Sequence, residues 1–386
     1  MKRILLTGAR APVTLDLVRH FHRSGHEVYL ADSIHLPLAR LSRFAKRTFV
    51  VSKPVHNPSQ FVQDLATIAR NYRIDLVVPT CEEIFYVSSL LELFPDHTKV
   101  FSEPLPKLEI LHNKWKFVQQ VSNRGGPVQA PETHLIASQQ ELSPWTAHPQ
   151  LSDWVFKPVY SRFASRTLVG PTSQEIAKLC PTTVDPWVAQ RRIVGQEFST
   201  YSLAHQGKLR AHACYRSKYR AGLGSGIYFL TVDDARIREF VQSFVTQQKF
   251  TGQLGFDLIQ GQDGKLYVLE CNPRATSGLH MLAVEPLASA FLESSGPLLE
   301  PTSMRPAMLA SVMLLFPFPQ TLRRGGVLTL FKDMLAARDV MFAWNDPMPA
   351  LLSPLSILEV LVTACRTGKP LTRAATFDIE WNGEPM

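Results

Sequence analysis

Gly255–Arg274, with the sequence GFDLIQGQDGKLYVLECNPR, is the stretch that decides the fold. Within it, two apolar runs flank residues 262–265, whose central Asp-Gly pair is typical of a β-hairpin turn. Asp257 and Glu270 stand thirteen residues apart, so antiparallel pairing can set their carboxylates side by side. Because side chains alternate along a strand, Asn272 shares the face of Glu270. We therefore expect three oxygen donors to converge, an arrangement that suits Mg²⁺ when the ion also holds phosphate.

The same pattern also fits a surface hairpin whose acids are simply solvated. The residues that follow favour the ion site, because Asn272-Pro273-Arg274 places an amide and a guanidinium directly beyond the acids. Cys271 lies between two predicted ligands, and alternation points it away from them, so we interpret it as a packing residue.

The composition is that of a globular chain with an excess of positive charge. Its 386 residues suffice for two or three domains, and 45% of them are hydrophobic, which allows large cores. The net charge of +8 suits either a nucleic acid or a small anionic substrate such as a nucleotide. The densest basic cluster, residues 216–220, is short, so we expect no nucleic-acid partner.

Cysteine usage and hydropathy indicate the compartment. The five cysteines are scattered and lack CxxC spacing, which argues against a zinc site or disulfides and favours a reducing cytoplasm. The apolar start at residues 4–6 is too short for a signal segment. Residues 308–318 are too short to span a bilayer and contain Pro317. We expect a cytoplasmic protein without a membrane partner.

The first hundred residues alternate between strand and helix patterns. A strand over 3–8, a helix over 14–24 and a strand over 26–32 predict a βαβ unit of a parallel sheet. Asp32 ends this unit where the ribose-binding acid of a dinucleotide site would lie. Only one glycine, Gly8, stands in the first turn, which disfavours an NAD site.

A second turn of this region carries two acids. Residues 80–83, Thr-Cys-Glu-Glu, follow an apolar strand at the end where α/β sheets place ligands. Glu82 or Glu83 can contact a substrate amine there. Acids are equally common in the first turn of a helix, so a purely structural role stays open.

Two lysines stand out in the middle of the chain. Prolines at 104 and 106 mark a domain boundary, and the helix predicted over 107–123 carries Lys114. Lys157 lies inside an apolar strand, where a lysine either reaches outward or pairs with an anion. The loop that follows is rich in hydroxyl and basic residues, and Ser161 and Ser165 can cradle phosphates.

The last part of the chain has no chemical motif of its own. Beyond Pro301 the pattern predicts helices over 308–315, 327–338 and 351–366, and a final strand over 377–381.

In their order and spacing, the polar residues resemble the ATP-grasp superfamily. The residues that carry the resemblance are Lys114, Lys157, Gln190, Glu197, Asp257, Glu270, Asn272 and Arg274. The chain is most similar to the synthetase domains of the carbamoyl-phosphate-synthase large subunit and to stand-alone carboxylate–amine ligases, over roughly residues 1–300. The resemblance implies an α/β fold with three parts. These are a Rossmann-like pre-ATP-grasp domain over 1–105, a two-part α+β ATP-grasp domain over 106–300 with halves at 106–186 and 187–300, and a C-terminal α-rich subdomain over 301–386.

The resemblance also implies roles for individual residues. ATP would be held by two lysines, a loop, a hinge whose backbone reads adenine, and an acid for the ribose: Lys114, Lys157, Ser161, Ser165, Gln190, Arg191, Ile193 and Glu197. Mg²⁺, which Mn²⁺ can replace, would be bound by Asp257, Glu270 and Asn272. Arg274 would steady the transferred phosphoryl group.

Three features lie outside the usual pattern. The loop between Ser161 and Ser165 contains no glycine, which puts its closure over ATP in doubt. Asp257 stands where many relatives carry Gln or Glu, yet it is still a good Mg²⁺ ligand. Arg216 precedes the glycine-rich segment 222–226, and it is our candidate for a further catalytic contact with an anionic substrate, with a solvated position as the alternative.

The resemblance implies an ATP-dependent carboxylate–amine ligase. Its small-molecule acid would become an acyl phosphate, and an amine would displace phosphate to form an amide, with ATP going to ADP. A kinase of an alcohol, a carbamoyl-phosphate-type activation of bicarbonate, and a nucleotide-binding protein without catalysis are the alternatives. A homodimer is one assembly that we consider.

Overall fold

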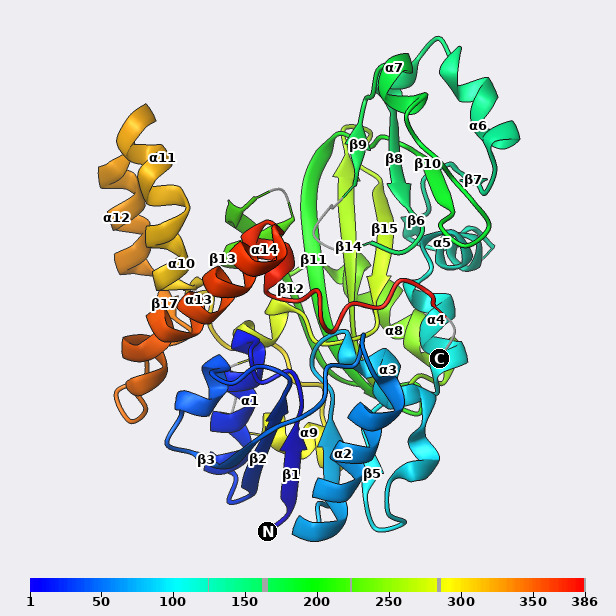
Figure 1. The fold of residues 1–386 in the computed structure, drawn as a ribbon. Coiled ribbons are helices and arrows are strands. Elements are labelled where there is room, and N and C mark those ends of the chain that lie inside the picture. Colours follow the sequence, from blue (N-terminus) through cyan, green and yellow to red (C-terminus); the bar gives the residue numbers. More distant parts are fainter. Residues whose placement is uncertain (124, 162–165, 223, 283–285, 385–386) are drawn as a thin grey trace.

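The computed structural model describes residues 1–123, 125–161, 166–222, 224–282 and 286–384 (Figure 1). The N-terminal part is built on a parallel sheet with the order β3-β2-β1-β4-β5. Its strands are β1 (Arg3–Leu6), β2 (Glu27–Asp32), β3 (Ala45–Val50), β4 (Leu76–Val78) and β5 (Lys99–Val100). Its helices are α1 (Pro12–Arg23), η1 (Leu38–Leu41), α2 (Pro58–Tyr72), α3 (Glu83–Ser89) and η2 (Leu91–Leu93). Ile4, Leu5 and Leu6 are fully buried, as a parallel strand covered on both faces requires.

The helix predicted over 107–123 is in fact two helices, α4 (Leu105–His112) and α5 (Lys114–Ser122). Asn113 breaks them, because its side chain accepts a hydrogen bond from the Lys116 backbone N–H at 2.9 Å and thereby caps α5. Its amide also donates to the Tyr160 hydroxyl at 3.0 Å. The break places Lys114 in the first turn of α5, where its side chain is buried.

A small antiparallel sheet follows, with the order β7-β10-β8-β9. Its strands are β7 (Thr133–Ile136), β8 (Trp154–Pro158), β9 (Leu168–Val169) and β10 (Trp187–Arg191), accompanied by α6 (Gln139–Thr146), η3 (Leu151–Asp153) and α7 (Ser173–Ile176). We expected the first half of the domain to end before Trp187. Instead, β10 pairs with both β7 and β8, so the chain leaves this sheet only after Arg191.

The largest sheet has eight strands in the order β17-β16-β13-β12-β11-β14-β15-β6. These are β6 (Val128–Gln129), β11 (Gly195–His205), β12 (Lys208–Ala221), β13 (Ser225–Val232), β14 (Gly252–Gly261), β15 (Leu266–Asn272), β16 (Ala307–Met308) and β17 (Arg338–Asp339). The associated helices are α8 (Ala235–Gln248), η4 (Ser277–Met281) and α9 (Leu287–Leu292). Phe256 of β14 packs against Phe117, Phe240 and Phe244, so α5 and α8 cover one face of the hairpin.

The C-terminal part contributes helices that gather at one side of the molecule (Figure 1). They are α10 (Ala310–Leu315), α11 (Pro317–Arg324), α12 (Val327–Ala336), α13 (Met348–Thr367) and α14 (Leu371–Ala374). The predicted strand over 377–381 is wrong, because this segment is a turn followed by irregular chain. Asp378 there turns inward to pair with Arg10 at 2.6 Å, and the Trp381 ring lies 4.9 Å from that of Phe85.

This C-terminal segment also closes the crevice of the first sheet. Asp32 is paired with Arg10 at 2.5 Å, and Arg10 in turn bonds Asp378. The cavity that remains beside Gly8, Asp32 and Ile379 has a volume of about 10 Å³, too small for a nucleotide. The structure therefore agrees with the sequence in disfavouring a dinucleotide here.

Candidate nucleotide site

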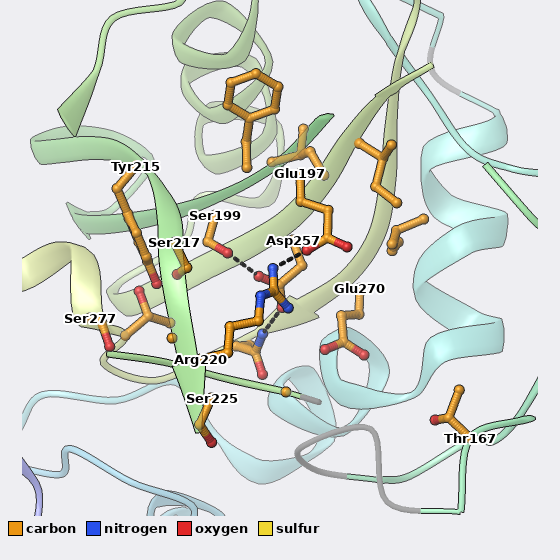
Figure 2. A pocket seen from close by; sticks show the side chains of 18 of the residues that line it. Thr167, Glu197, Ser199, Tyr215, Ser217, Arg220, Ser225, Asp257, Glu270 and Ser277 are labelled. Carbon is orange, nitrogen blue, oxygen red and sulfur yellow. Dashed lines mark hydrogen bonds and ion pairs between the residues drawn. The ribbon is translucent and has the colours of Figure 1, made fainter. Parts of the chain in front are cut away.

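A cavity of about 700 Å³ lies between the small sheet and the large sheet, and the first domain supplies part of its wall. The small sheet contributes Lys157 and Gln190, and the large sheet contributes Glu197 and Asp257. Figure 2 shows that side chains from several strands point into this space. Because the C-terminal ends of β1 and β4 also face it, the cavity lies where open α/β sheets place ligands.

The predicted hairpin is confirmed, and it holds two acids side by side. Asp257 of β14 is the direct antiparallel partner of Glu270 of β15, and a β-bulge follows between Asp257 and Leu258. Ser199 of β11 donates to Asp257 at 2.6 Å (Figure 2). The Asn272 amide donates to the other Asp257 oxygen at 3.0 Å. Cys271 is buried on the opposite face, as alternation predicts.

The two lysines lie beside the acids. Lys114 Nζ is 3.3 Å from a Glu270 oxygen and donates to the Ser161 carbonyl at 3.1 Å. Lys157, on β8, lines the same cavity and is buried. Two ammonium groups and two carboxylates thus meet in a space with little solvent, where charges interact strongly. Ser165 lies outside the described residues.

This crowding of charge moves the pKa values of the site. Burial raises the pKa of Asp257 to about 7, and the neighbouring Glu270 adds to that rise. Burial also opposes ionisation of Glu270, but Lys114 and Lys157 outweigh it and lower the pKa of Glu270 to about 2. Burial lowers the pKa of Lys157 to about 8, against the pull of Glu270. A bound cation would relieve the repulsion between the two acids, and a bound anion would favour the charged lysine.

The donor set fits Mg²⁺. Among the side chains that the structure describes, no three His, Cys, Asp or Glu residues gather in a way that could hold a metal by themselves. Two carboxylates and the Asn272 amide oxygen are nevertheless hard ligands, and Mg²⁺ usually completes such a partial set with water and substrate phosphate oxygens.

The hinge predicted around Gln190 connects the two sheets. The Gln190 side chain is buried and donates to Thr133 at 3.1 Å, so it stays within the small sheet. The Arg191 guanidinium lies 3.1 Å from Asp153, and the Arg191 backbone N–H donates to the Glu132 carbonyl at 2.7 Å. Ile193 lines the cavity.

The acid predicted for the ribose has an arginine partner that the sequence did not suggest. Glu197 of β11 lines the cavity and forms an ion pair with Arg220 of β12 (Figure 2). Arg216, which we selected, is exposed and is not among the lining residues, whereas its neighbours Tyr215 and Ser217 are. The prediction for Arg216 is therefore corrected in favour of Arg220. A β-bulge in β12 after Ser217 changes the side-chain alternation and brings Arg220 to the cavity.

Residues 111–278 match the family described as the ATP-grasp domain. The chain carries an ATP-grasp domain. No curated protein sequence matches the chain. Among solved structures, the N5-carboxyaminoimidazole synthetase of Staphylococcus aureus is similar, with a TM-score of 0.60 and 12% identity over 79% of this chain and 80% of that one.

Two further solved structures share the fold of the ATP-grasp domain and its neighbours. The L-amino acid ligase of Bacillus licheniformis has a TM-score of 0.54 and 14% identity, covering 75% of this chain and 69% of that one. The biotin carboxylase domain dimer of the Hydrogenobacter thermophilus 2-oxoglutarate carboxylase, in complex with MgADP, ADP and bicarbonate, has a TM-score of 0.58 and 13% identity. That match covers 77% of this chain and 70% of that chain. At such identities the likeness concerns the fold.

At the far end of the ATP-grasp domain, Arg274 faces the first domain. Its guanidinium donates to the Asn272 side-chain oxygen at 3.0 Å and lies 3.5 Å from a Glu82 oxygen. Glu83 has a structural role, since one of its oxygens accepts from the Thr7 hydroxyl at 2.6 Å and from the Thr80 backbone N–H at 3.0 Å. Of the two acids in this turn, Glu82 is the one next to the site.

The sequence analysis did not select Ser199 for the site, and it favoured a structural role for His280 over contact with substrate. Ser199 lies two positions after Glu197 on the same strand, so alternation could have found it. His280 also lines the cavity, and its Nδ1 is 2.8 Å from an Asp16 oxygen of α1, a link between domains that no local pattern encodes.

Proposed function

We propose that this chain is an ATP-dependent ligase that joins a carboxylate to an amine through an acyl phosphate. The observation that carries the proposal is the convergence of Lys114, Lys157, Asp257 and Glu270 on one cavity, at the end of which stands Arg274. Cations for the phosphates and acids for a metal are there, but no nucleophilic side chain is required, because phosphoryl transfer depends on positioning and electrostatics.

We place the nucleotide along the line of these residues. The backbone N–H of Arg191 already donates to the Glu132 carbonyl, so it is not free to bond adenine. Adenine would therefore lie further along the hinge, against Ile193. The ribose hydroxyls would bond Glu197, and the phosphates would extend toward Lys114 and Lys157. This direction brings the terminal phosphate to the hairpin acids. The ADP and MgADP in the related H. thermophilus structure support a nucleotide with magnesium in this fold.

Asp257, Glu270 and Asn272 would hold Mg²⁺, which neutralises phosphate charge when it is bound. The other contacts to the reacting groups would come from side chains of the protein. Lys114 and Lys157 fix the oxygens of the triphosphate, and Ser199 holds the Asp257 carboxylate in place. Arg274, itself held by Asn272, presents its guanidinium where negative charge develops on the transferred group.

The reaction has two steps. An oxygen of the substrate carboxylate attacks the γ-phosphorus, and the bond to the β-phosphate oxygen breaks, giving an acyl phosphate and ADP. The lone pair of the amine then attacks the acyl carbon, and phosphate leaves with its bonding electrons while the amine loses a proton to solvent or phosphate. Because water would compete with the amine, the burial of the site matters for the yield of amide.

The test is a screen of ADP release with pooled carboxylates and amines, followed by mass spectrometry of the product. We expect ADP release that requires both an acid and an amine, and a product whose mass is that of both minus water. Formation of a stable phosphate ester from an alcohol would identify a kinase instead. A protein that binds ATP yet forms no product with any pool would contradict the ligase proposal.

A further inference from the structure

Two helices at one side of the molecule carry exposed apolar stripes. On α13 the stripe is formed by residues at intervals of four, three and four, which places them on one face. Its members are Leu351, Leu355, Leu358 and Val362. On α12 the corresponding residues are Leu328, Phe331 and Leu335, of which Leu328 and Leu335 are 79% and 82% exposed.

The exposed stripe of α12 is additional to its core face. Leu330 of the same helix is fully buried, and Met334 packs with it into a cluster that includes Tyr228 and Met313. The helix is therefore apolar toward the protein and toward solvent. Large exposed apolar patches mark interaction surfaces. Nearby Trp344 is 91% exposed.

The charges around these stripes have one sign. Each of the four acids between residues 310 and 374 is turned inward to a partner. The pairs are Asp333 with Lys218, Asp339 with the Ala310 N–H, Asp346 with Arg19, and Glu359 with the N–H groups of His35 and Leu36. In contrast, the exposed charged side chains described in this segment are Arg323, Lys332, Arg366 and Arg373, of which Arg373 lies 3.9 Å from Glu380.

We propose that α12 and α13, together with Trp344, bind the surface of an anionic lipid bilayer. Exposed leucines would enter the boundary between headgroups and acyl chains, and the arginines and lysine would contact anionic headgroups. This surface fits a second copy of the chain less well. In a two-fold contact the same patch meets itself, so these cations would face one another without exposed acids between them.

The geometry favours a helix that lies on the membrane. By length and composition, Met348–Thr367 could also cross a bilayer. However, Glu359 in its middle accepts the backbone N–H groups of His35 and Leu36 at 2.9 Å and 2.7 Å, which ties α13 to the first domain. Spanning the bilayer would break these bonds and bury the carboxylate in lipid. We expected no membrane partner from the sequence, because residues 351–366 have the pattern of an ordinary apolar helix.

The test is co-sedimentation of the full chain with vesicles of phosphatidylcholine alone or with 30% phosphatidylglycerol. We expect binding to the anionic vesicles, weakened by salt, and a blue shift of tryptophan emission that Trp344→Phe reduces. Leu328→Gln combined with Leu335→Gln should weaken binding at least tenfold. The matched control is Val184→Gln, because Val184 is equally exposed at 82% but lies far from these helices in the sequence and in a different domain.

Charge variants provide a second, independent arm. Arg323→Gln combined with Lys332→Gln should reduce binding to the anionic vesicles while leaving the packed core untouched. Absence of binding to anionic vesicles, or binding that neither pair of variants changes, would overturn the proposal. Sedimentation velocity gives the competing outcome: a dimer that the leucine variants dissociate would show that a second copy covers this surface.

Discussion

Arg274 of the ATP-grasp domain lies 3.5 Å from Glu82 of the first domain, and both side chains are largely buried. This pair links the hairpin of the proposed metal site to the turn after β4. We expect Glu82→Gln to leave Arg274 poorly fixed and to lower the rate of ADP release about tenfold, the equivalent of about 1.4 kcal/mol for the loss of a buried ion pair. ATP affinity, measured by calorimetry, should stay unchanged. A matching loss of affinity would mean that Glu82 acts on nucleotide binding instead.

The hairpin acids should be essential for turnover. Glu270→Gln removes one of the two carboxylates without changing its size, and we expect ADP release to fall at least a hundredfold, or about 3 kcal/mol in transition-state stabilisation. Cys271→Ala is the control, because Cys271 is adjacent in sequence but points to the opposite face. Steady-state assays at several Mg²⁺ concentrations measure both. Wild-type activity in Glu270→Gln would remove the hairpin from the proposed metal site.

Arg220 and Arg216 form a matched pair on β12, one inside the cavity and one outside it. Arg220→Ala leaves Glu197 without its ion-pair partner, so we expect the KM for ATP to rise severalfold, in line with the modest energy of a partly exposed pair. Arg216→Ala should leave KM and kcat as they are. A rise in the KM for ATP in Arg216→Ala but not in Arg220→Ala would restore Arg216 as the arginine that contacts the substrate.

His112 should make the stability of the protein sensitive to mild acid. Burial lowers its pKa to about 4 from an ordinary value near 6.5, so the unfolded chain takes up a proton that the folded chain excludes. The stability contributed by the neutral ring is present above pH 6.5 and is lost as the pH falls toward 4, by up to about 3 kcal/mol.

Replacement by phenylalanine isolates that contribution. His112 lies among the rings of Phe85, Tyr160 and Trp381, so His112→Phe keeps the aromatic packing. We expect urea unfolding between pH 7 and 4 to show a shallower loss of stability in this variant. Identical pH profiles for the two proteins would place the acid sensitivity elsewhere.

Trp381 should contribute strongly to stability although it lies close to the end of the described chain. Its ring packs against Phe85 and Tyr160 and is 3% exposed, so Trp381→Ala should cost about 3 to 5 kcal/mol. Trp344→Ala is the control, because that ring is solvent-exposed and should change the thermal midpoint little. Equal effects in thermal unfolding would contradict this assignment.

The sequence predicted the hairpin because its signals are local. Alternation fixes the faces of Asp257, Glu270 and Asn272, and Asp263-Gly264 fixes the turn between the strands. The buried Lys157 was found for a related reason, since a lysine within an apolar strand stands out, whereas Lys114 was selected by the family resemblance. The family resemblance then ordered these parts along a nucleotide.

Other features depend on partners distant in the sequence. Arg220 reaches the cavity only because a bulge interrupts β12, and the sequence of residues 216–220 does not indicate that bulge. Apolar and polar residues alternate over 377–381 as they do in a strand. However, Asp378 pairs with Arg10, more than three hundred residues away, and the segment forms a turn instead. The Asn113 break is different, because there a local cap prevailed over a continuous helical pattern.

The packing of Trp381 near His112 has a consequence for the order in which the protein matures. His112 precedes Lys114 by two residues, so the aromatic cluster that includes Trp381 supports the helix start that carries Lys114, the lysine that we propose binds phosphate. A chain still emerging from the ribosome lacks this support until residue 381 is free. The start of α5 therefore gains its aromatic packing only after the segment around Trp381 has been made.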